Sequence, residues 1–550
     1  MAQGRVLLIA GSDSSGGAGL EAGQKVLAAH GCYAMTATTA LTVQNTTGVK
    51  GIHVIPAEFV ERQVEACLDD VGADVVTTGM LAAADTIEVI ARQVVKHKVH
   101  TLVVDPVWFH PASSDNSLFS SLLVSARSLP VVNFIRQVMV STSGAQLLPR
   151  EAIQGLSQHL LPLTTVLTPN IPEARLILAE GSKSSSVPRQ PREISSVADV
   201  EAMGRQIQAL GPEWVLVKGG HLPFRADMTV AQTEAERQVV VDVLVGPGQY
   251  VLRVESPWQE STNTHGTGCS LAAAISSGLA TGRDVPSSVR TACRYIEAGI
   301  RTAPNLGSGH GPLGHFHSTY NLLFSPGYFV EYLLDRPDVR DVWKKFVYHP
   351  FVMALGDGTL PLESFKGYII QDYLYLIHFA RANALASYKA KNVDDISRSS
   401  KIVQHIMHEL KLHINYCKSF GIPVAVMRAT EEKQACTAYT RYVLDVGQSD
   451  DWLALQMALP PCLLGYGAAA KMLHAHPQTR RDEGNAYWPW IQNYVADDFV
   501  QAVKLGSQLL EDNMRLQSPS RIEELVKIFI HATKMEIGFW EMFPYKQAAS

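Results

Sequence analysis

The chain has 550 residues, too many for one hydrophobic core, and indicates roughly two to four domains of the usual size. A formal net charge of −5 with 18% charged residues gives no basic footprint for nucleic acid or acidic membranes. The seven cysteines are scattered and odd in number, which favours a reducing compartment over a disulfide scaffold. We therefore expect a soluble, cytoplasmic protein without nucleic-acid or membrane partners.

Apolar runs alternate with helical segments through the first half of the chain. Residues 5–10 (RVLLIA) have a buried-strand pattern and feed a glycine-rich loop at 11–19. Later apolar runs also end in polar or glycine residues, at 75–80, 101–107, 164–170 and 214–220. This alternation predicts an α/β domain with a mostly parallel sheet, helices on both faces and a site along the strand ends.

The polar residues at these strand ends differ in chemistry. Asp105, Asn170 and Glu173 carry oxygens that can hold Mg²⁺ through water. Lys218 can neutralise a phosphate. Each residue by itself also fits a helix cap or a turn, but their recurrence at the ends of one sheet favours a site.

The run 263–270 (NTHGTGCS) precedes a stretch of small apolar residues that reads as a helix start. Gly266, Thr267 and Gly268 can turn their backbone amides toward an anion at the positive end of the helix dipole. Cys269 lies at this helix start, where we expect its thiol pKa to fall so that a thiolate can act as a base. On this run alone, a glycine-rich turn before a core helix with one buried cysteine remains an equal alternative.

Several motifs of this half occur together: AGSDSSGGAGLEA, TTALTVQNTTGV, TGML, DPV, LTPNIPEA, VKGGH and NTHGTGCSLAAAI. In combination they resemble the hydroxymethylpyrimidine and hydroxymethylpyrimidine-phosphate kinases of thiamin synthesis, which implies a ribokinase-like fold for residues 1–310. ATP would be the co-substrate and Mg²⁺ the metal.

The resemblance also implies roles for single residues. Gly11, Gln44 and Met80 would line the pyrimidine pocket. Cys269 would be the base that takes the hydroxyl proton, and Lys218 would serve ATP. The metal and phosphates would be served by Asp105, Asn170 and Glu173, and the anion hole would be formed by Gly266, Thr267 and Gly268.

The chain departs from the kinase pattern in three places. Gly23 stands where the family usually has Asp, and Thr77 stands in place of a usual Lys. Residues 107–137 interrupt the pattern, and deleting these 31 residues restores DPVMVSTSG. We interpret 107–137 as a translated intron, with a genuine surface insertion as the alternative.

The alternation of strand-like and helical segments ends near residue 305. Residues 311–327 are rich in Gly and His and are predicted to be a linker. Residues 328–550 have the three- and four-residue apolar spacing of packed amphipathic helices. His408 and His413 lie five apart, on different faces of a helix, which favours a solvated or partly buried helix over a zinc site.

Some of these helices carry polar and aromatic residues where a core helix would have Leu. A thiol (Cys462) and a carboxylate (Glu536) could serve as nucleophile and proton carrier. A second carboxylate and an aromatic cage could bind a planar nitrogen heterocycle, from Asp372, Tyr375, Tyr466 and Tyr487. A helix bundle with stray polar residues remains the alternative at this point.

The second half also contains the motifs QDYLYLIHFARANALA, CTAYTRYVLDVG, ALPPCLLGYG, YWPWIQNYVADDF and KMEIGFWEM. They resemble the thiaminase II (TenA-like) family, which implies an all-α helical bundle. By this resemblance Cys462 would attack the pyrimidine ring, Glu536 would shuttle protons and Asp372 would bind the ring nitrogen and exocyclic amine. The substrate would stack on or bond to Tyr375, Tyr439, Tyr466 and Tyr487.

The two resemblances predict one bifunctional enzyme of thiamin biosynthesis or salvage. One half would release hydroxymethylpyrimidine from thiamin or an aminopyrimidine, and the other would phosphorylate it twice with MgATP. We expect a homo-oligomer whose partners are these small molecules. The alternatives are a pyridoxal/pyridoxine-type kinase with a helical ligand-binding or sensor domain, and a non-catalytic ligand sensor.

Overall fold

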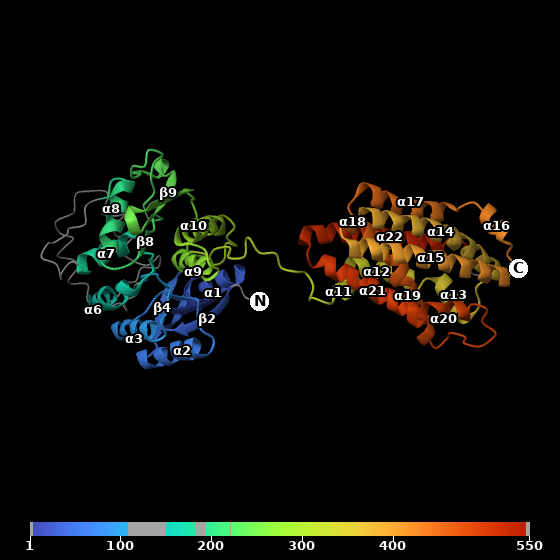
Figure 1. The fold of residues 1–550 in the computed structure, drawn as a ribbon, viewed down its shortest axis with the longest axis horizontal. Helices are drawn as coiled ribbons and strands as arrows, with labels where there is room; N and C mark the ends of the chain where they lie inside the picture. Colours follow the sequence, from blue (N-terminus) through green and yellow to red (C-terminus); the bar gives the residue numbers. More distant parts are fainter. Residues whose placement is uncertain (1–3, 108–149, 182–193, 221, 546–550) are drawn as a thin grey trace. The chain divides into compact units, whose positions relative to one another are not determined.

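The computed structural model describes residues 4–107, 150–181, 194–220 and 222–545. The chain divides into two compact units, Met1–Thr319 and Tyr320–Ser550 (Figure 1). This division falls within the segment predicted to be a linker. The proposed insertion at 107–137 lies outside the described residues apart from Val107.

An eight-stranded sheet forms the centre of the N-terminal unit, in the order β10-β9-β8-β7-β6-β5-β1-β2. Strands β1, β2, β5, β6, β7 and β8 pair in parallel, and β9 runs antiparallel to both of its neighbours. The strands of this sheet are β1 Arg5–Ala10, β2 Tyr33–Thr38, β5 Val75–Thr78, β6 Leu102–Val104, β7 Val166–Leu167, β8 Trp214–Val217, β9 Val239–Val245 and β10 Val251–Pro257. A separate antiparallel hairpin consists of β3 Ala40–Asn45 and β4 Gly48–Val54.

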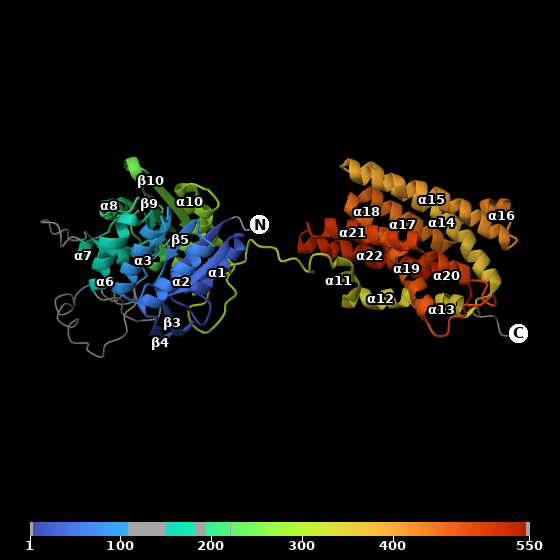
Figure 2. The ribbon, with the colours of Figure 1, turned by 60° about the horizontal axis from the view of Figure 1, so that its bottom comes forward.

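Helices cover both faces of this sheet (Figure 2). They are α1 Gly19–Ala29, α2 Ala57–Asp70, α3 Ala84–Lys96, α6 Arg150–Gly155, α7 Ile171–Gly181, α8 Val197–Gln208, α9 Thr267–Ala280 and α10 Val285–Arg301. Short helical turns occur at η1 Leu156–Leu160, η2 Leu161–Leu163, η4 Glu234–Glu236 and η5 Pro247–Gln249.

Two apolar cores lie against the two faces of the sheet, because successive side chains of a strand point to opposite faces. In β1, Leu7 and Ile9 belong to the core that includes residues of α2, α3, α7 and α8. Val6 and Leu8 belong to the other core, with residues of α1, α9 and α10. The predicted α/β architecture with a mostly parallel sheet is therefore confirmed.

The stretch that follows α10 packs back onto the N-terminal unit. The side chain of Asn263 donates to Asn305 at 2.6 Å, and the backbone N–H of His265 donates to the carbonyl of Gly311 at 3.1 Å. The backbone N–H of His310 donates to the carbonyl of Thr46, in the turn of the β3–β4 hairpin, at 2.8 Å. We call residues 305–317 the strap, because this segment joins the hairpin turn to the loop before α9.

The C-terminal unit consists of helices and loops over its described residues, 320–545, as predicted. Its helices are α11 Phe329–Asp335, α12 Pro337–Val347, α13 Pro350–Asp357, α14 Leu362–Lys389, α15 Val393–Ser419, α16 Val424–Ala429, α17 Gln434–Ser449, α18 Trp452–Ala458, α19 Pro460–Ala475, α20 Trp488–Val495, α21 Asp497–Met514 and α22 Pro519–Trp540. A single large core joins them, with Phe346, Phe351, Tyr368 and Trp540 at its centre.

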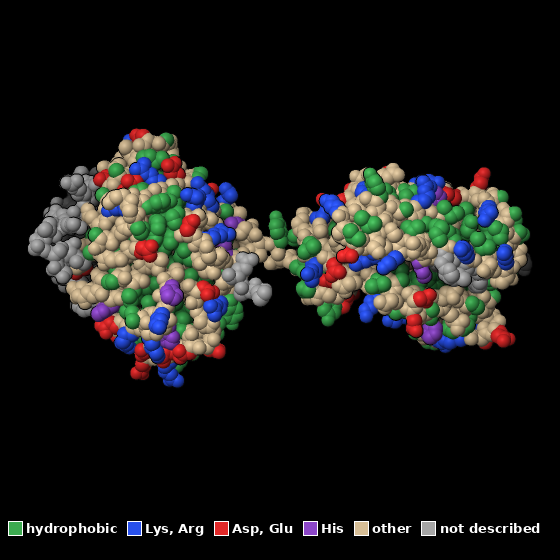
Figure 3. Space-filling view, viewed as in Figure 1, with side chains coloured by type: hydrophobic (Ala, Val, Ile, Leu, Met, Phe, Trp, Pro, Cys, Tyr) green, Lys and Arg blue, Asp and Glu red, His purple; other side chains and the backbone are tan. Residues whose placement is uncertain are grey.

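Among the described residues, one helical stretch, Trp452–Ala475, has the length and apolar character of a membrane span. Its apolar window is 72% buried inside the unit, as expected for a core helix. In the view of Figure 3, basic and acidic side chains are interspersed over the described surface, in keeping with the small net charge.

Candidate functional sites

Three neighbouring parallel strands, β6, β7 and β8, bring their polar ends together in the N-terminal unit. The ammonium of Lys218 lies 2.6 Å from Oδ1 of Asp105 and 3.8 Å from Oε2 of Glu173. Thr168 donates its hydroxyl to the same Asp105 oxygen at 2.9 Å. The backbone N–H of Asn170 donates to Glu173 Oε2, and Asn170 Oδ1 accepts from the N–H of Glu173. The structure therefore brings these four predicted residues together, and it shows in addition that Lys218 lies between the two carboxylates.

Burial controls the charges in this cluster. The Glu173 carboxyl is desolvated, which raises its pKa to about 7 in spite of the nearby Lys218 charge. Burial alone would lower the pKa of Lys218, but the charges of Asp105 and Glu173 outweigh it and raise the pKa to about 12. Lys218 is therefore a fixed positive charge in a low-dielectric site, where Coulomb interactions are stronger than in water.

The N-terminus of α9 stands over the Asp105–Lys218 pair. A Cβ atom on Gly268 would lie 3.3 Å from both Asp105 Oδ2 and Lys218 Nζ. Gly266 caps the helix with φ of 76°, in the left-handed region, and a Cβ there would lie 1.9 Å from the carbonyl oxygen of Gly17. Only glycine fits at 266, because the loop before α9 packs directly against the first glycine-rich loop.

Cys269 follows this cap, but its thiol does not have the lowered pKa that we expected from the helix start. Burial, and then the charge of Asp105, raise the pKa of Cys269 to about 12, although a hydrogen bond from the Gly19 backbone acts in the opposite direction. That expectation is wrong in this structure because desolvation of a thiolate outweighs the field of one helix end.

The predicted pyrimidine-pocket residues lie on adjoining segments. A Cβ on Gly11 would lie 2.3 Å from the methyl carbon of Met80, so the absence of a side chain at 11 makes room for Met80. The loop after β1 runs beside β3, where the Ser12 carbonyl accepts from the Thr42 hydroxyl at 2.9 Å. Gln44 lies further along β3 with its side chain 3.2 Å from Nε2 of His265. The structure thus joins Gly11 to Met80, and Gln44 to the loop that carries the anion hole.

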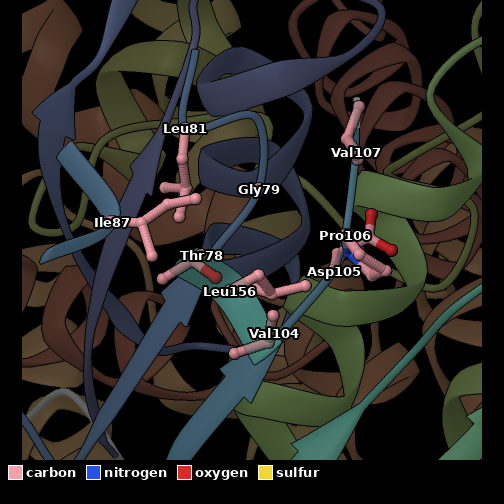
Figure 4. A pocket seen from close by; sticks show the side chains of 9 residues that line it. All are labelled: Thr78, Gly79, Leu81, Ile87, Val104, Asp105, Pro106, Val107 and Leu156. Carbon is pink, nitrogen blue, oxygen red and sulfur yellow. The ribbon is translucent and has the colours of Figure 1, made fainter. Parts of the chain in front are cut away.

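A cavity adjoins Asp105 at the ends of β5 and β6 (Figure 4). In the figure, Leu81 and Ile87 lie at the left, Asp105 at the right, and the Leu156 side chain between them. Its remaining lining residues are Thr78, Gly79, Val104, Pro106 and Val107. Thr78 Oγ1 and Asp105 Oδ2 are buried without a hydrogen-bond partner, so both polar atoms can accept a bond from a bound group.

A second site forms in the C-terminal unit around Glu536 of α22. Tyr439 of α17 donates its hydroxyl to Glu536 Oε1 at 2.7 Å, and the Tyr375 ring stacks on Tyr439 at 4.9 Å. Burial raises the pKa of Glu536 to about 8 against the hydrogen bond from Tyr439, with a smaller contribution from the charge of Asp372. After burial, the charge of Cys462 is the next cause that raises the pKa of Tyr375. The buried Glu536, Tyr375 and Tyr439 therefore lie in one region, and the partly buried Cys462 lies close enough to affect the titration of Tyr375.

Asp372 has a partner that the sequence analysis missed. His413 of α15 places Nε2 2.7 Å from Asp372 Oδ2, and both side chains are largely buried. The spacing of His408 and His413 within one helix predicts a solvated or partly buried helix. It cannot show that His413 faces a carboxylate on the neighbouring helix α14. In the structure α14 packs along α15, and the residue spacing within 393–419 alone does not show this pairing.

The other two predicted tyrosines differ in their surroundings. The Tyr466 ring packs 5.2 Å from Trp540 and 6.0 Å from Trp490, and its pKa is raised by burial and then by the charges of Tyr368 and Glu536. Tyr487 donates its hydroxyl to the Leu360 carbonyl. Tyr466 therefore lies within reach of the Glu536 region, whereas the hydroxyl of Tyr487 is bonded to the backbone.

Tyr368 of α14 was not predicted as a site residue. It is fully buried, and burial and then the charge of Asp372 raise its pKa, while hydrogen bonds with Tyr466 and Trp490 act in the opposite direction. Tyr368 lies one helical turn before Asp372 in α14, and its contacts link Asp372 to the Tyr466 and Trp490 side of the site. The spacing of four residues between Tyr368 and Asp372 places both on one face of the helix and was a usable signal, but the sequence analysis considered only Tyr375 beside Asp372.

The N-terminal unit is thus an α/β domain with a buried cation beneath a glycine-capped helix, and the C-terminal unit is a helical domain with a cluster of a carboxyl, tyrosines and a thiol. The phosphomethylpyrimidine kinase family model matches residues 13–135 and 129–314, and the TENA/THI-4/PQQC family model matches residues 336–544.

Relatives match over nearly the whole chain. The Schizosaccharomyces pombe protein named "Putative hydroxymethylpyrimidine/phosphomethylpyrimidine kinase 2" is 37% identical over 98% of this chain and 90% of its own length. The Saccharomyces cerevisiae hydroxymethylpyrimidine/phosphomethylpyrimidine kinase THI20 is 30% identical over 97% of this chain and 94% of its own. The chain therefore belongs to the phosphomethylpyrimidine kinase family and carries a TENA/THI-4/PQQC family domain after its kinase-family domain.

Solved structures resemble the N-terminal unit. An ADP complex of Bacillus subtilis pyridoxal kinase is 27% identical in sequence, and the match covers 57% of this chain and 97% of the kinase chain with a TM-score of 0.43. A Clostridium difficile phosphomethylpyrimidine kinase is 29% identical and covers 53% of this chain and 98% of its own, with a TM-score of 0.36.

Proposed function

We propose that this protein is a bifunctional enzyme of thiamin biosynthesis or salvage. Residues 1–310 phosphorylate hydroxymethylpyrimidine and its monophosphate with ATP, and residues 328–550 release hydroxymethylpyrimidine from thiamin or aminopyrimidines. The buried Asp105–Lys218 pair beneath the glycine-capped N-terminus of α9 carries the kinase proposal. The relatives that match the whole chain favour hydroxymethylpyrimidine over pyridoxine as the kinase substrate.

Each group of the kinase site has a distinct electrostatic task. Lys218 neutralises a phosphoryl oxygen, and the amides around Gly266 and Gly268 receive the charge that develops during transfer. The substrate hydroxyl faces Cys269, which takes its proton only after its own pKa is lowered from about 12. The fixed cation and the anion hole therefore provide most of the stabilisation, and Cys269 adds proton transfer.

The residues at the strand ends fit a magnesium ion that keeps water and phosphate ligands. Among the described residues, no group of three or more His, Cys, Asp or Glu side chains is placed to hold a metal. Asp105 Oδ2 is nevertheless a buried carboxylate oxygen without a partner, and Glu173 lies close by across Lys218. Because Mg²⁺ usually binds one or two carboxylates, water and substrate phosphates, Asp105 and Glu173 would hold it, and the ion would neutralise the phosphates of ATP. The Asn170 side chain instead fixes the backbone of Glu173.

In the helical domain, we assign Cys462 as the nucleophile toward the pyrimidine ring and Glu536 as the proton carrier. A pKa of about 8 keeps Glu536 protonated at neutral pH, so it can donate a proton as the ring carbon is attacked. Asp372, held by His413, would bind the ring nitrogen and exocyclic amine. The C–N bond then breaks and the thiazole or amine leaves from the methylene carbon. Water adds to that carbon and passes a proton back to Glu536, and the bond between Cys462 and the ring breaks, which releases hydroxymethylpyrimidine and restores the thiol.

Mass spectrometry of the reaction products tests both halves at once. Full-length protein with hydroxymethylpyrimidine and MgATP should yield the monophosphate and diphosphate, and thiamin or aminopyrimidine alone should yield hydroxymethylpyrimidine. A clear preference for pyridoxine in the kinase reaction would overturn the first proposal, and ligand binding without turnover in either half would indicate a sensor. We also propose a cytoplasmic homo-oligomer, which light scattering of the purified protein would test.

A further inference from the structure

Asp13 lies at the centre of the glycine-rich loop that follows β1. Its side chain is 1% exposed, and four hydrogen bonds from its own loop reach its carboxylate. Oδ1 accepts from the N–H and hydroxyl of Ser15, and Oδ2 accepts from the N–H groups of Gly17 and Ala18. Burial would raise the pKa of Asp13, but hydrogen bonds from His265 and Ser15 outweigh it and hold the pKa well below its usual value. Asp13 is therefore a carboxylate that can only accept hydrogen bonds.

This carboxylate determines the role of the His265 ring. Nε2 of His265 lies 2.8 Å from Asp13 Oδ2. Because the carboxylate accepts, Nε2 must carry a hydrogen and donate it, whether the imidazole is neutral or protonated. His265 precedes the cap residue Gly266, so this bond also ties the loop before α9 to the loop after β1.

The same Nε2 atom determines the orientation of the Gln44 amide. The structure places the amide nitrogen of Gln44 3.2 Å from Nε2 of His265. Nε2 has one hydrogen and no free lone pair, so it cannot accept from an NH₂ group, whereas a carbonyl oxygen can share that hydrogen with Asp13 Oδ2 in a three-centre bond. Which end of a glutamine amide is oxygen must be assigned from its hydrogen-bond network. The atom that faces His265 is therefore the carbonyl oxygen, and the NH₂ group points to the other side.

The backbone at Gln44 is held separately from its side chain. The Ser14 hydroxyl accepts from the Gln44 N–H at 2.9 Å and donates to the Gln44 carbonyl at 2.8 Å. The strap holds the turn that follows, through His310 and Thr46. Because the backbone is fixed, the side-chain torsions and the amide orientation are the freedom left to Gln44, and His265 acts on these.

We propose that Asp13 and His265 are positioning residues that turn the NH₂ group of Gln44 toward the bound pyrimidine, where it donates to an acceptor nitrogen of the ring. This inference rests on the proposed kinase function and adds a determinant of substrate specificity to it. Neither Asp13 nor His265 contacts the substrate in this arrangement. A ring that presents a hydrogen-bond donor at this position would leave two donors facing each other and would bind more weakly.

A double-mutant cycle between His265 and Gln44 tests the proposal in the full-length protein. Gln44→Ala and His265→Leu should each raise the KM for hydroxymethylpyrimidine ~10-fold, the usual consequence of a lost or misdirected hydrogen bond, with little change in the KM for ATP. The double variant should have nearly the KM of Gln44→Ala, because His265 acts through Gln44. His265→Gln should restore most of the affinity, since a glutamine amide can still donate to Asp13. Thiamin cleavage by the same molecules, measured in parallel, controls for concentration and folding.

A glutamate at position 44 provides a second test that does not disturb the loop before α9. In Gln44→Glu, one carboxylate oxygen still accepts from His265, but no donor remains for the ring, so the KM for the pyrimidine should rise as much as in Gln44→Ala. A KM for Gln44→Glu close to that of the unchanged protein would overturn the amide orientation. His265 would have only a structural role if the effects of His265→Leu and Gln44→Ala were additive and His265→Leu lowered kcat and raised the KM values for both substrates.

Failure of the proposed function would look different. If the unchanged protein phosphorylated no hydroxymethylpyrimidine, or if Gln44→Ala left its KM unaltered, the pyrimidine subsite itself would be wrong and this inference would fall with it. If Gln44→Ala raised the KM but the cycle showed additivity, the subsite would stand and only the roles of Asp13 and His265 would be rejected.

Discussion

Replacement of Glu536 by Gln should stabilise the protein at neutral pH while removing its thiamin-cleaving activity. The folded-state pKa of Glu536 is about 8, against an ordinary value of 4.5. Below pH 4.5 the carboxyl is protonated in both the folded and the unfolded state, so its raised pKa does not change the free energy of unfolding. As the pH rises from 4.5 toward 8, the free energy of unfolding falls, because the carboxyl releases its proton in the unfolded chain but keeps it in the folded protein. Each pKa unit corresponds to about 1.4 kcal/mol.

The size of the effect follows from these two pKa values. At pH 5 ionisation of Glu536 stabilises the unfolded state only slightly, and the raised pKa lowers the free energy of unfolding by about 1 kcal/mol. At pH 7 Glu536 is still mostly protonated in the folded state but ionised in the unfolded state, and the penalty is about 3 kcal/mol. Gln has no such penalty, and its carbonyl can still accept the Tyr439 hydroxyl. The free energy of unfolding of Glu536→Gln should therefore exceed that of the unchanged protein by about 2 kcal/mol more at pH 7 than at pH 5.

Urea unfolding of the full-length protein at both pH values, followed by tryptophan fluorescence, measures this difference. The exposed residue Glu541, just beyond the same helix, gives the matched control Glu541→Gln, which should not alter the pH dependence. An equal gain at pH 5 and pH 7 for Glu536→Gln would refute the reasoning, since the gain would then come from packing and not from the proton. Retained thiamin cleavage in the same variant would separately reject Glu536 as proton carrier.

Four further predictions concern the two sites. Cys462→Ser should abolish thiamin cleavage with kinase activity unchanged, and substantial turnover would reject this thiol as nucleophile. Cys269→Ala should slow phosphorylation about 10²–10⁴-fold, the usual contribution of a positioned base, and unchanged rates at saturating substrate would remove it from the mechanism. Gly266→Ala should abolish kinase activity but not thiamin cleavage, because its Cβ would lie 1.9 Å from the Gly17 carbonyl; near-normal phosphorylation would contradict the backbone geometry. Deletion of 107–137 should raise kinase activity if that segment is a translated intron, whereas a loss of activity, or its presence in all translated transcripts, would favour a genuine insertion.

The strand ends and the helix start were predictable because each is a local pattern with a physical cause. Asp105 and Lys218 each follow an apolar run, and parallel strands place their carboxyl ends on one edge. What the sequence could not reveal is which side chains pair across distant segments. His413 binds an aspartate that lies 41 residues earlier, and His265 binds Asp13 across 252 residues. These pairs depend on the packing of whole helices and loops.

The pKa of Cys269 was mispredicted for a related reason. The helix start at Thr267 is visible in the sequence, and its dipole favours a thiolate. The depth at which the thiol is buried, and the nearness of the Asp105 carboxylate, are tertiary properties. Local sequence reasoning therefore predicted the effect of the helix dipole on the pKa of Cys269, but not the net shift of that pKa.

The strap has a consequence for how the two halves of this chain can be separated. A gene split directly after α10 would remove Asn305, the partner of Asn263, and Gly311, which accepts from the loop before α9. It would also remove His315, which bonds Ser270 inside α9, so the shortened kinase half would lose part of the wall behind its own anion hole. Fusion or fission that keeps both halves working is thus restricted to the short interval between His317 and Phe324, because Phe324 is buried in the core of the C-terminal unit and packs on Phe329.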